Sequence, residues 1–306
     1  MKYYFLILAI IVFSFNIYAQ NNSKSFTSKP KLPQILSHNS ELSSELIELN
    51  NSAVQKAIQG NYQEAIPLFR QILNEFPTSH QVQYNLGQSL NKDGQLDEAI
   101  EVLTNLIKIK PDYADGYSAL GETYFNKGYF EKSVSYFRRA LEIEPNDAIV
   151  LGNLGSALYK VKEFDESLLV LNKAIQLQPD LSGAYNDRGV TLFSFGRYKE
   201  AMADFRKAIS LNPASAEPHN NLGIVLVQIN KPKEAHQAFL EAVRLRPDWN
   251  HALYNLGISF VARGDRNAAR NQLNTLTNYD QDLADKLQKA IWKKYVVNAS
   301  GFTSKN

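Results

Sequence analysis

Residues 80–113 read HQVQYNLGQSLNKDGQLDEAIEVLTNLIKIKPDY, and residue types at fixed places in this stretch return every 34 residues along the chain. The glycine returns as Gly87, Gly121, Gly155, Gly189, Gly223 and Gly257. The proline returns as Pro77, Pro111, Pro145, Pro179, Pro213 and Pro247. Two independent series that share one period predict a tandem-repeat architecture and not an ordinary globular domain.

A small residue and a bulky apolar residue recur with the same period, which indicates that each unit is a pair of antiparallel helices. The small series is Ala65, Ala99, Ser133, Ser167, Ala201, Ala235 and Ala269. The bulky series is Phe69, Leu103, Phe137, Leu171, Phe205, Phe239 and Leu273. Glycine inside a helix costs about 1 kcal/mol relative to alanine. We therefore expect the second helix to approach the glycine closely, with the small residues as the reciprocal surface.

Turn and end signals divide each unit into its two helices. Seven residues beyond the first helix's glycine, a second glycine is expected to close that helix in the left-handed conformation. This second series is Gly60, Gly94, Gly128, Gly196 and Gly264, with Lys162 and Asn230 at the two remaining places. The proline is expected to end the second helix, because it disfavours helical geometry in the residue before it. The polar residues that follow five of the prolines are predicted helix caps: Thr78, Asp112, Asn146, Asp180 and Asp248.

The combined pattern resembles the tetratricopeptide repeat, and its seven units of 34 residues cover 238 residues. The units begin at residues 46, 80, 114, 148, 182, 216 and 250. The resemblance implies an all-α fold over residues 41–283, a right-handed superhelical solenoid of antiparallel helix pairs. After it, Leu283, Leu287, Ile291 and Trp292 form an amphipathic stripe, which predicts a capping helix over residues 284–296. Residues 297–306 are expected to form a disordered tail.

The first twenty residues have the composition of an export signal. Lys2 precedes an apolar run over residues 3–15, and Ala19 is a small residue suited to signal peptidase. We therefore predict a signal peptide over residues 1–19, a flexible leader over 20–40, and a periplasmic or secreted protein. An uncleaved signal anchor is the alternative, and membrane contact is expected only in that case.

Composition and motifs give no indication of catalysis. The net charge of +2 does not favour nucleic acid as a partner, and the absence of cysteine excludes thiolate chemistry. The sequence contains no phosphate loop, no dinucleotide fingerprint and no nucleophile elbow. The five histidines have no metal-ligand spacing. We therefore expect no catalytic residue, no metal and no cofactor.

The resemblance implies that the first helices line a concave groove that binds a polypeptide. The residue two before the glycine is often an amide, which predicts a row that pairs with a bound backbone: Asn85, Asn153, Asn221 and Asn255. The alternative is that these amides only form hydrogen bonds between helices. A second predicted groove feature is an exposed apolar strip: Val190, Phe193, Ile224, Val227, Ile258 and Val261. The alternative is that the solenoid packs this strip internally.

Our leading hypothesis is a non-catalytic protein–protein interaction scaffold in the cell envelope. The alternative is a regulatory or adaptor subunit of an envelope enzyme complex, with catalysis supplied by a partner. Replacing Phe193 and Val227 with aspartate is expected to abolish partner capture and to leave the helical content intact. The relatives that clamp a C-terminal carboxylate need a lysine three residues before the glycine. Tyr84 and Ser118 occupy two of these places, so that specificity is not expected.

Overall fold

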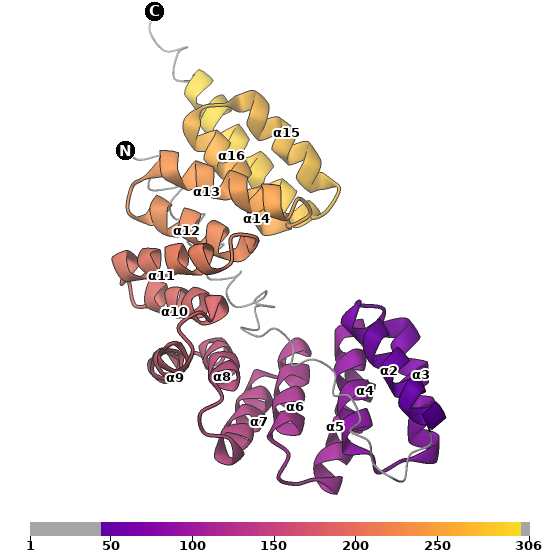
Figure 1. Ribbon diagram of the computed structural model, residues 1–306. Helices are drawn as coiled ribbons and strands as arrows, with labels where there is room; N and C mark the ends of the chain where they lie inside the picture. The colour runs from indigo at the N-terminus through magenta and orange to yellow at the C-terminus, as the bar shows by residue number, and fades with distance from the viewer. Residues whose placement is uncertain (1–43, 301–306) are drawn as a thin grey trace, which may run out of the picture. The chain divides into compact units, whose positions relative to one another are not determined.

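The computed structural model describes residues 44–300, and every element in this range is an α-helix (Figure 1). The predicted all-α fold of consecutive antiparallel helix pairs is therefore confirmed. The predicted signal peptide, leader and first residues of the repeat domain, together with residues 301–306 of the predicted tail, lie outside the described range.

The helices form two compact units, which are described separately. Residues 44–181 form α2 (Ser44–Ile58), α3 (Tyr62–Glu75), α4 (His80–Asp93), α5 (Leu96–Ile109), α6 (Ala114–Asn126), α7 (Phe130–Ile143), α8 (Ala148–Lys160) and α9 (Phe164–Leu177). Residues 182–300 form α10 (Ser182–Ser194), α11 (Tyr198–Leu211), α12 (Ala216–Gln228), α13 (Pro232–Leu245), α14 (Asn250–Arg263), α15 (Arg266–Thr277) and α16 (Gln281–Ser300). Six of the seven first helices begin at the residue where the period places a unit.

The glycines of the first helices lie against the bulky series of the second helices. A Cβ atom on Gly155 would lie 2.5 Å from Leu171 Cγ, and one on Gly121 would lie 2.7 Å from the Phe137 ring. The small residues contact the glycine backbone instead: Ser167 Oγ donates a hydrogen bond of 2.8 Å to the Gly155 carbonyl. The close approach that we expected is present, but the bulky residue occupies the space that a glycine leaves, and not the small one.

The turns follow the prediction more closely than the helix caps do. Lys162 and Asn230 have φ angles of 67° and 63°, so both adopt the left-handed conformation that glycine supplies in the other repeats. The predicted caps are wrong by one residue, because the residue after the proline lies within the turn. Tyr113 and Asp147 are the N-cap residues of α6 and α8. Asp147 caps with its side chain, accepting from the backbone of the second and third residues of the helix.

The first helices line the inner side of each unit. In residues 44–181, α2, α4, α6 and α8 contact one another in succession, and in residues 182–300 α10 contacts α12. Second helices of neighbouring repeats within a unit contact one another less. Because the first helices are closer together, each unit curves toward their side, and the side chains two, three and nine residues into the predicted groove positions share this inner face.

Ion pairs connect the second helices of alternate repeats. The same arginine position pairs with the same glutamate position 28 residues further on, at three junctions that are 68 residues apart. The pairs are Arg70 with Glu98 at 2.6 Å, Arg138 with Glu166 at 2.7 Å, and Arg206 with Glu234 at 3.7 Å. Each pair is solvent-exposed and contributes about 0.2–1 kcal/mol. The 34-residue repeat thus carries a 68-residue alternation.

Helix α16 packs on the last helix pair. It begins three residues before the predicted capping helix 284–296 and ends four residues after it, at Ser300, within the segment predicted as a tail. Leu283, Leu287 and Ile291 are buried at intervals of four residues. A Cβ on Gly257 would lie 2.5 Å from Leu287, so α16 supplies the bulky residue for the last glycine. Trp292 was predicted to lie in this stripe but is 59% exposed, because it follows Ile291 on the opposite side of the helix.

Candidate polypeptide-binding face

Amide side chains connect neighbouring repeats on the inner face of residues 182–300. Asn221 Nδ2 on α12 donates to Asn186 Oδ1 on α10 over 3.0 Å. Asn255 Nδ2 on α14 donates to Asn220 Oδ1 on α12 over 2.8 Å. The two bonds occupy equivalent positions one repeat apart. The amide nitrogens therefore bond between helices, as the alternative for the predicted row proposed.

The amide oxygens of the same two residues have no partner. Asn221 Oδ1 and Asn255 Oδ1 are buried and accept no hydrogen bond from the protein, and Asn220 Nδ2 is a buried donor in the same situation. Leaving a buried polar atom unpaired costs about 1–3 kcal/mol. Each repeat position thus combines a nitrogen bonded to the preceding repeat with an unused acceptor.

The amides of residues 44–181 have a different environment. Asn85 on α4 is 1% exposed. Asn153 on α8 is fully buried and donates from Nδ2 to Glu122 Oε1 on α6 over 3.2 Å. The predicted amide row is therefore not one uniform ladder, because this unit binds its asparagine to a carboxyl group.

Glu122 is a buried carboxyl group that the sequence analysis did not select. Burial raises its pKa, while the charge of Lys92 and hydrogen bonds from Gln88 and Asn153 oppose that rise. A signal was present in the sequence. The residue after the glycine is charged only in this repeat; the series reads Gln88, Glu122, Ser156, Val190, Ile224 and Ile258.

The predicted apolar strip is not exposed in the structure. Phe193, Ile224, Val227, Ile258 and Val261 are between 0% and 6% exposed, and Val190 is half-buried. The Phe193 ring lies 5.2 Å from the ring of Tyr198. The expectation that aspartate at Phe193 and Val227 would leave folding intact is therefore wrong, because both side chains are buried and a charge there would be desolvated.

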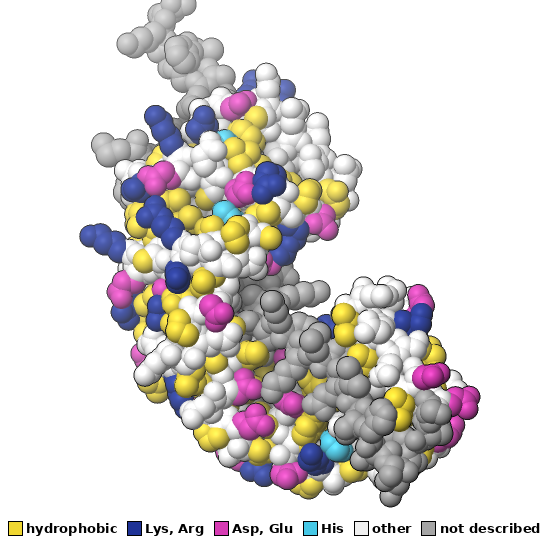
Figure 2. Space-filling model, in the orientation of Figure 1, with side chains coloured by type: hydrophobic (Ala, Val, Ile, Leu, Met, Phe, Trp, Pro, Cys, Tyr) yellow, Lys and Arg dark blue, Asp and Glu magenta, His cyan; other side chains and the backbone are white. Residues whose placement is uncertain are grey.

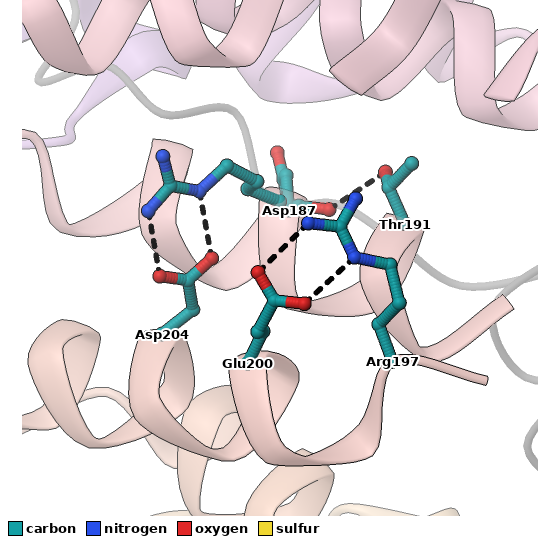
Figure 3. Close-up of polar contacts among 6 residues, drawn as sticks. Asp187, Thr191, Arg197, Glu200 and Asp204 are labelled. Atoms are coloured by element: carbon teal, nitrogen blue, oxygen red, sulfur yellow. Dashed lines mark hydrogen bonds and ion pairs between the residues drawn. The ribbon is translucent and has the colours of Figure 1, made fainter. Parts of the chain in front are cut away.

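A second buried ionic contact lies between α10 and α11 (Figure 3). Arg188 forms two hydrogen bonds of 2.7 Å with the carboxylate of Asp204, and this contact raises the pKa of Arg188. The side chains are 22% and 9% exposed. In the neighbouring repeats a leucine stands where Arg188 does, immediately before the glycine. The interruption of that leucine series was the available sequence signal.

The histidines and charged groups show no metal site in the described part of the chain. His236 Nδ1 lies 2.8 Å from Ser259 Oγ, and this contact joins α13 to α14; burial lowers the pKa of His236. Within residues 44–300, no group of three or more His, Asp or Glu side chains could hold a metal ion. Figure 2 shows basic and acidic side chains interspersed within each unit. Over the same residues, no helix combines the length and the apolar character needed to cross a membrane.

These helix pairs, stacked through glycine contacts and left-handed turns, define a helical-repeat solenoid. Sequence models of the tetratricopeptide repeat match residues 57–123, 114–147, 148–181, 191–230 and 220–282. The chain therefore belongs to the tetratricopeptide repeat family, a fold that suggests a protein–protein interaction scaffold. The comparison with curated proteins gave no match.

Solved structures of other tetratricopeptide repeat proteins share the fold. Pseudomonas aeruginosa PilF is 20% identical, with a TM-score of 0.60 over 69% of this chain and 96% of its own. A tetratricopeptide repeat protein of Parabacteroides merdae is 14% identical, with a TM-score of 0.65 over 81% of this chain and 99% of its own. A chain of the Cut9–Hcn1 complex of the APC/C is 13% identical, with a TM-score of 0.70 over 94% of this chain and 52% of its own. At these identities the likeness concerns the fold alone.

Proposed function

We propose that this protein is a non-catalytic scaffold that binds a polypeptide partner along the inner face of its first helices. The observation that carries this proposal is the pair of unused acceptors, Asn221 Oδ1 and Asn255 Oδ1, at equivalent positions of successive repeats. A bound polypeptide presents backbone N–H donors at regular intervals, and each donor could satisfy one of these oxygens. Binding would then recover part of the cost of leaving those atoms unpaired.

The other predicted groove residues have graded roles in this proposal. Asn85 and Asn153 occupy the equivalent position in the first unit, and we place them on the same binding face. The six apolar residues are buried and therefore support the face from beneath instead of contacting the partner first. The interspersed charge supports a polypeptide over nucleic acid as the partner.

We also propose that the protein works outside the cytoplasm, in the periplasm or at the cell surface. The support is the composition of residues 1–19, which is that of a signal peptide. Cell fractionation and mass spectrometry of the mature N-terminus test this point. A mature chain that begins at Gln20 is expected, and a cytoplasmic chain that keeps Met1 contradicts the proposal.

Crosslinking of the protein in its native envelope, followed by capture of the identified partner on purified protein, tests the binding face. Asn221→Ala with Asn255→Ala is expected to weaken capture at least tenfold, while circular dichroism shows an unchanged helix content. Asn274→Ala, an exposed amide on α15, serves as the matched control. Capture equal to that of the unaltered protein removes the amides from the binding face. Hydrolase or transferase activity in the crosslinked assembly favours the adaptor alternative.

A further inference from the structure

The inner face of residues 44–181 contains a buried acidic site built from three first helices. Glu122 on α6 is 6% exposed and accepts from Asn153 on α8 over 3.2 Å. Gln88 on α4 also forms a hydrogen bond to Glu122, and its Nε2 donates to the Tyr84 hydroxyl over 3.3 Å. The carboxyl group is therefore held in place by amides from both neighbouring repeats.

This carboxyl group lacks a cation. No lysine or arginine of the described residues lies within ion-pair distance of Glu122. Among more distant groups, Lys92 on α4 attracts the carboxylate and Asp115 on α6 repels it. The contrast is Asp204, a carboxylate of similar burial that has Arg188 as its partner. Buried charges in proteins are normally paired, so the site is incomplete as it stands.

A second atom of the site is also unsatisfied. Gln88 Oε1 is buried and accepts no hydrogen bond, although the nitrogen of the same amide is used. A guanidinium or ammonium group carries several N–H donors and no acceptor. One basic group can therefore pair with the Glu122 carboxylate and donate to Gln88 Oε1 at the same time.

The corresponding positions in residues 182–300 cannot make this selection. The residues that follow the glycine there are Val190, Ile224 and Ile258, which are apolar. Recognition of charge is therefore confined to the first unit, and the second unit offers amide oxygens to a backbone.

We propose that the Glu122 site binds a lysine or arginine side chain of the polypeptide partner. The proposal rests on the function proposed above and adds the chemical identity of one residue of the ligand. It makes Glu122 the group that pairs with the cation, and Gln88 and Asn153 the groups that hold the carboxylate in position.

Selection of a phage-displayed random dodecapeptide library against the purified full chain tests this inference. The unaltered protein is expected to enrich peptides with lysine or arginine at one fixed position. Glu122→Gln, which keeps the shape of the side chain, is expected to lose that enrichment. Glu101→Gln removes one charge from an exposed position on α5 and serves as the matched control, with enrichment like that of the unaltered protein.

Affinities measured by fluorescence polarisation make the test quantitative. Replacing the fixed lysine of a selected peptide with norleucine is expected to weaken binding to the unaltered protein at least tenfold, and to Glu122→Gln less than twofold. Enriched peptides without a fixed basic residue, or equal losses on both proteins, overturn the Glu122 assignment alone. The absence of enriched peptides on all three proteins overturns the proposed function, and this assignment with it.

Discussion

Replacing Gly155 with alanine tests the contact on which every helix pair depends. Alanine favours a helix interior over glycine by about 1 kcal/mol, so the change should stabilise α8 if nothing opposed it. However, the new Cβ would lie 2.5 Å from Leu171 Cγ and 2.7 Å from its Cδ2. Leu171 is fully buried, and Cγ is the branch point of its side chain, so rotation of the end methyl groups cannot relieve the contact.

The magnitudes give a net loss in the native sequence and a gain once Leu171 is shortened. Overpacking costs about 1–3 kcal/mol, which exceeds the propensity gain, and Gly155→Ala should lower the free energy of unfolding by up to about 2 kcal/mol. Leu171→Ala alone should cost about 2–5 kcal/mol. In that background the space beside residue 155 is open, and Gly155→Ala should then stabilise the protein by about 1 kcal/mol.

A double-mutant cycle measured by urea unfolding, followed by circular dichroism, checks this reversal of sign. The four proteins of the cycle give the coupling between the two positions directly. Ser135→Ala, an exposed position in α7, controls for a change of helix propensity without a change of packing. If Gly155→Ala has the same effect in both backgrounds, Leu171 is not what requires the glycine, and our account of the helix pairing fails.

Three further predictions concern the buried polar groups. Asp204→Ala should cost about 1–3 kcal/mol in urea unfolding because it leaves Arg188 partly buried without its carboxylate, whereas Arg188→Leu with Asp204→Val should stay within about 1 kcal/mol of the parent; equal losses would contradict this. Burial raises the pKa of Glu122, so the native state holds that proton more tightly than the unfolded chain, and the associated stability is lost as the pH rises through the raised pKa. Glu122→Gln should therefore gain in melting temperature relative to the parent between pH 4 and pH 8, and a constant difference would refute the buried carboxyl. Asn255→Ala should cost about 1–3 kcal/mol because Asn220 Oδ1 loses its donor, and Asn220→Ala in the same chain should reduce that cost.

The fold was predictable because the repeat period reports the same contact seven times. Gly155 and its equivalents marked the close helix approach, and Lys162 marked a left-handed turn although lysine rarely adopts one. The period cannot tell which of two neighbouring second-helix positions fills the space beside a glycine, because both recur. It also cannot place a cap within one residue, since Asp112 and Tyr113 are adjacent and the choice depends on the geometry of the turn.

The candidate site was less predictable, because its residues depart from the period. Glu122 and Arg188 each occur once at a position that is otherwise amide or apolar, and their importance depends on the burial of their charge. Burial also separated the two predicted groove features. Sequence position places Asn255 and Val261 on one helix, but only the structure shows that the amide has an unused acceptor and that the valine is 1% exposed.

The alternating ion pairs of the second helices limit how such an array can change its length. Removal of residues 80–113 alone would bring Lys132 opposite Arg70, two like charges. Removal of residues 80–147 would bring Glu166 there and restore an opposite charge. Growth or shortening by four helices at a time keeps the outer charges complementary, whereas a step of two helices creates repulsion at the new junction. The heritable building block of this protein is therefore twice the length of the motif by which its family is recognised.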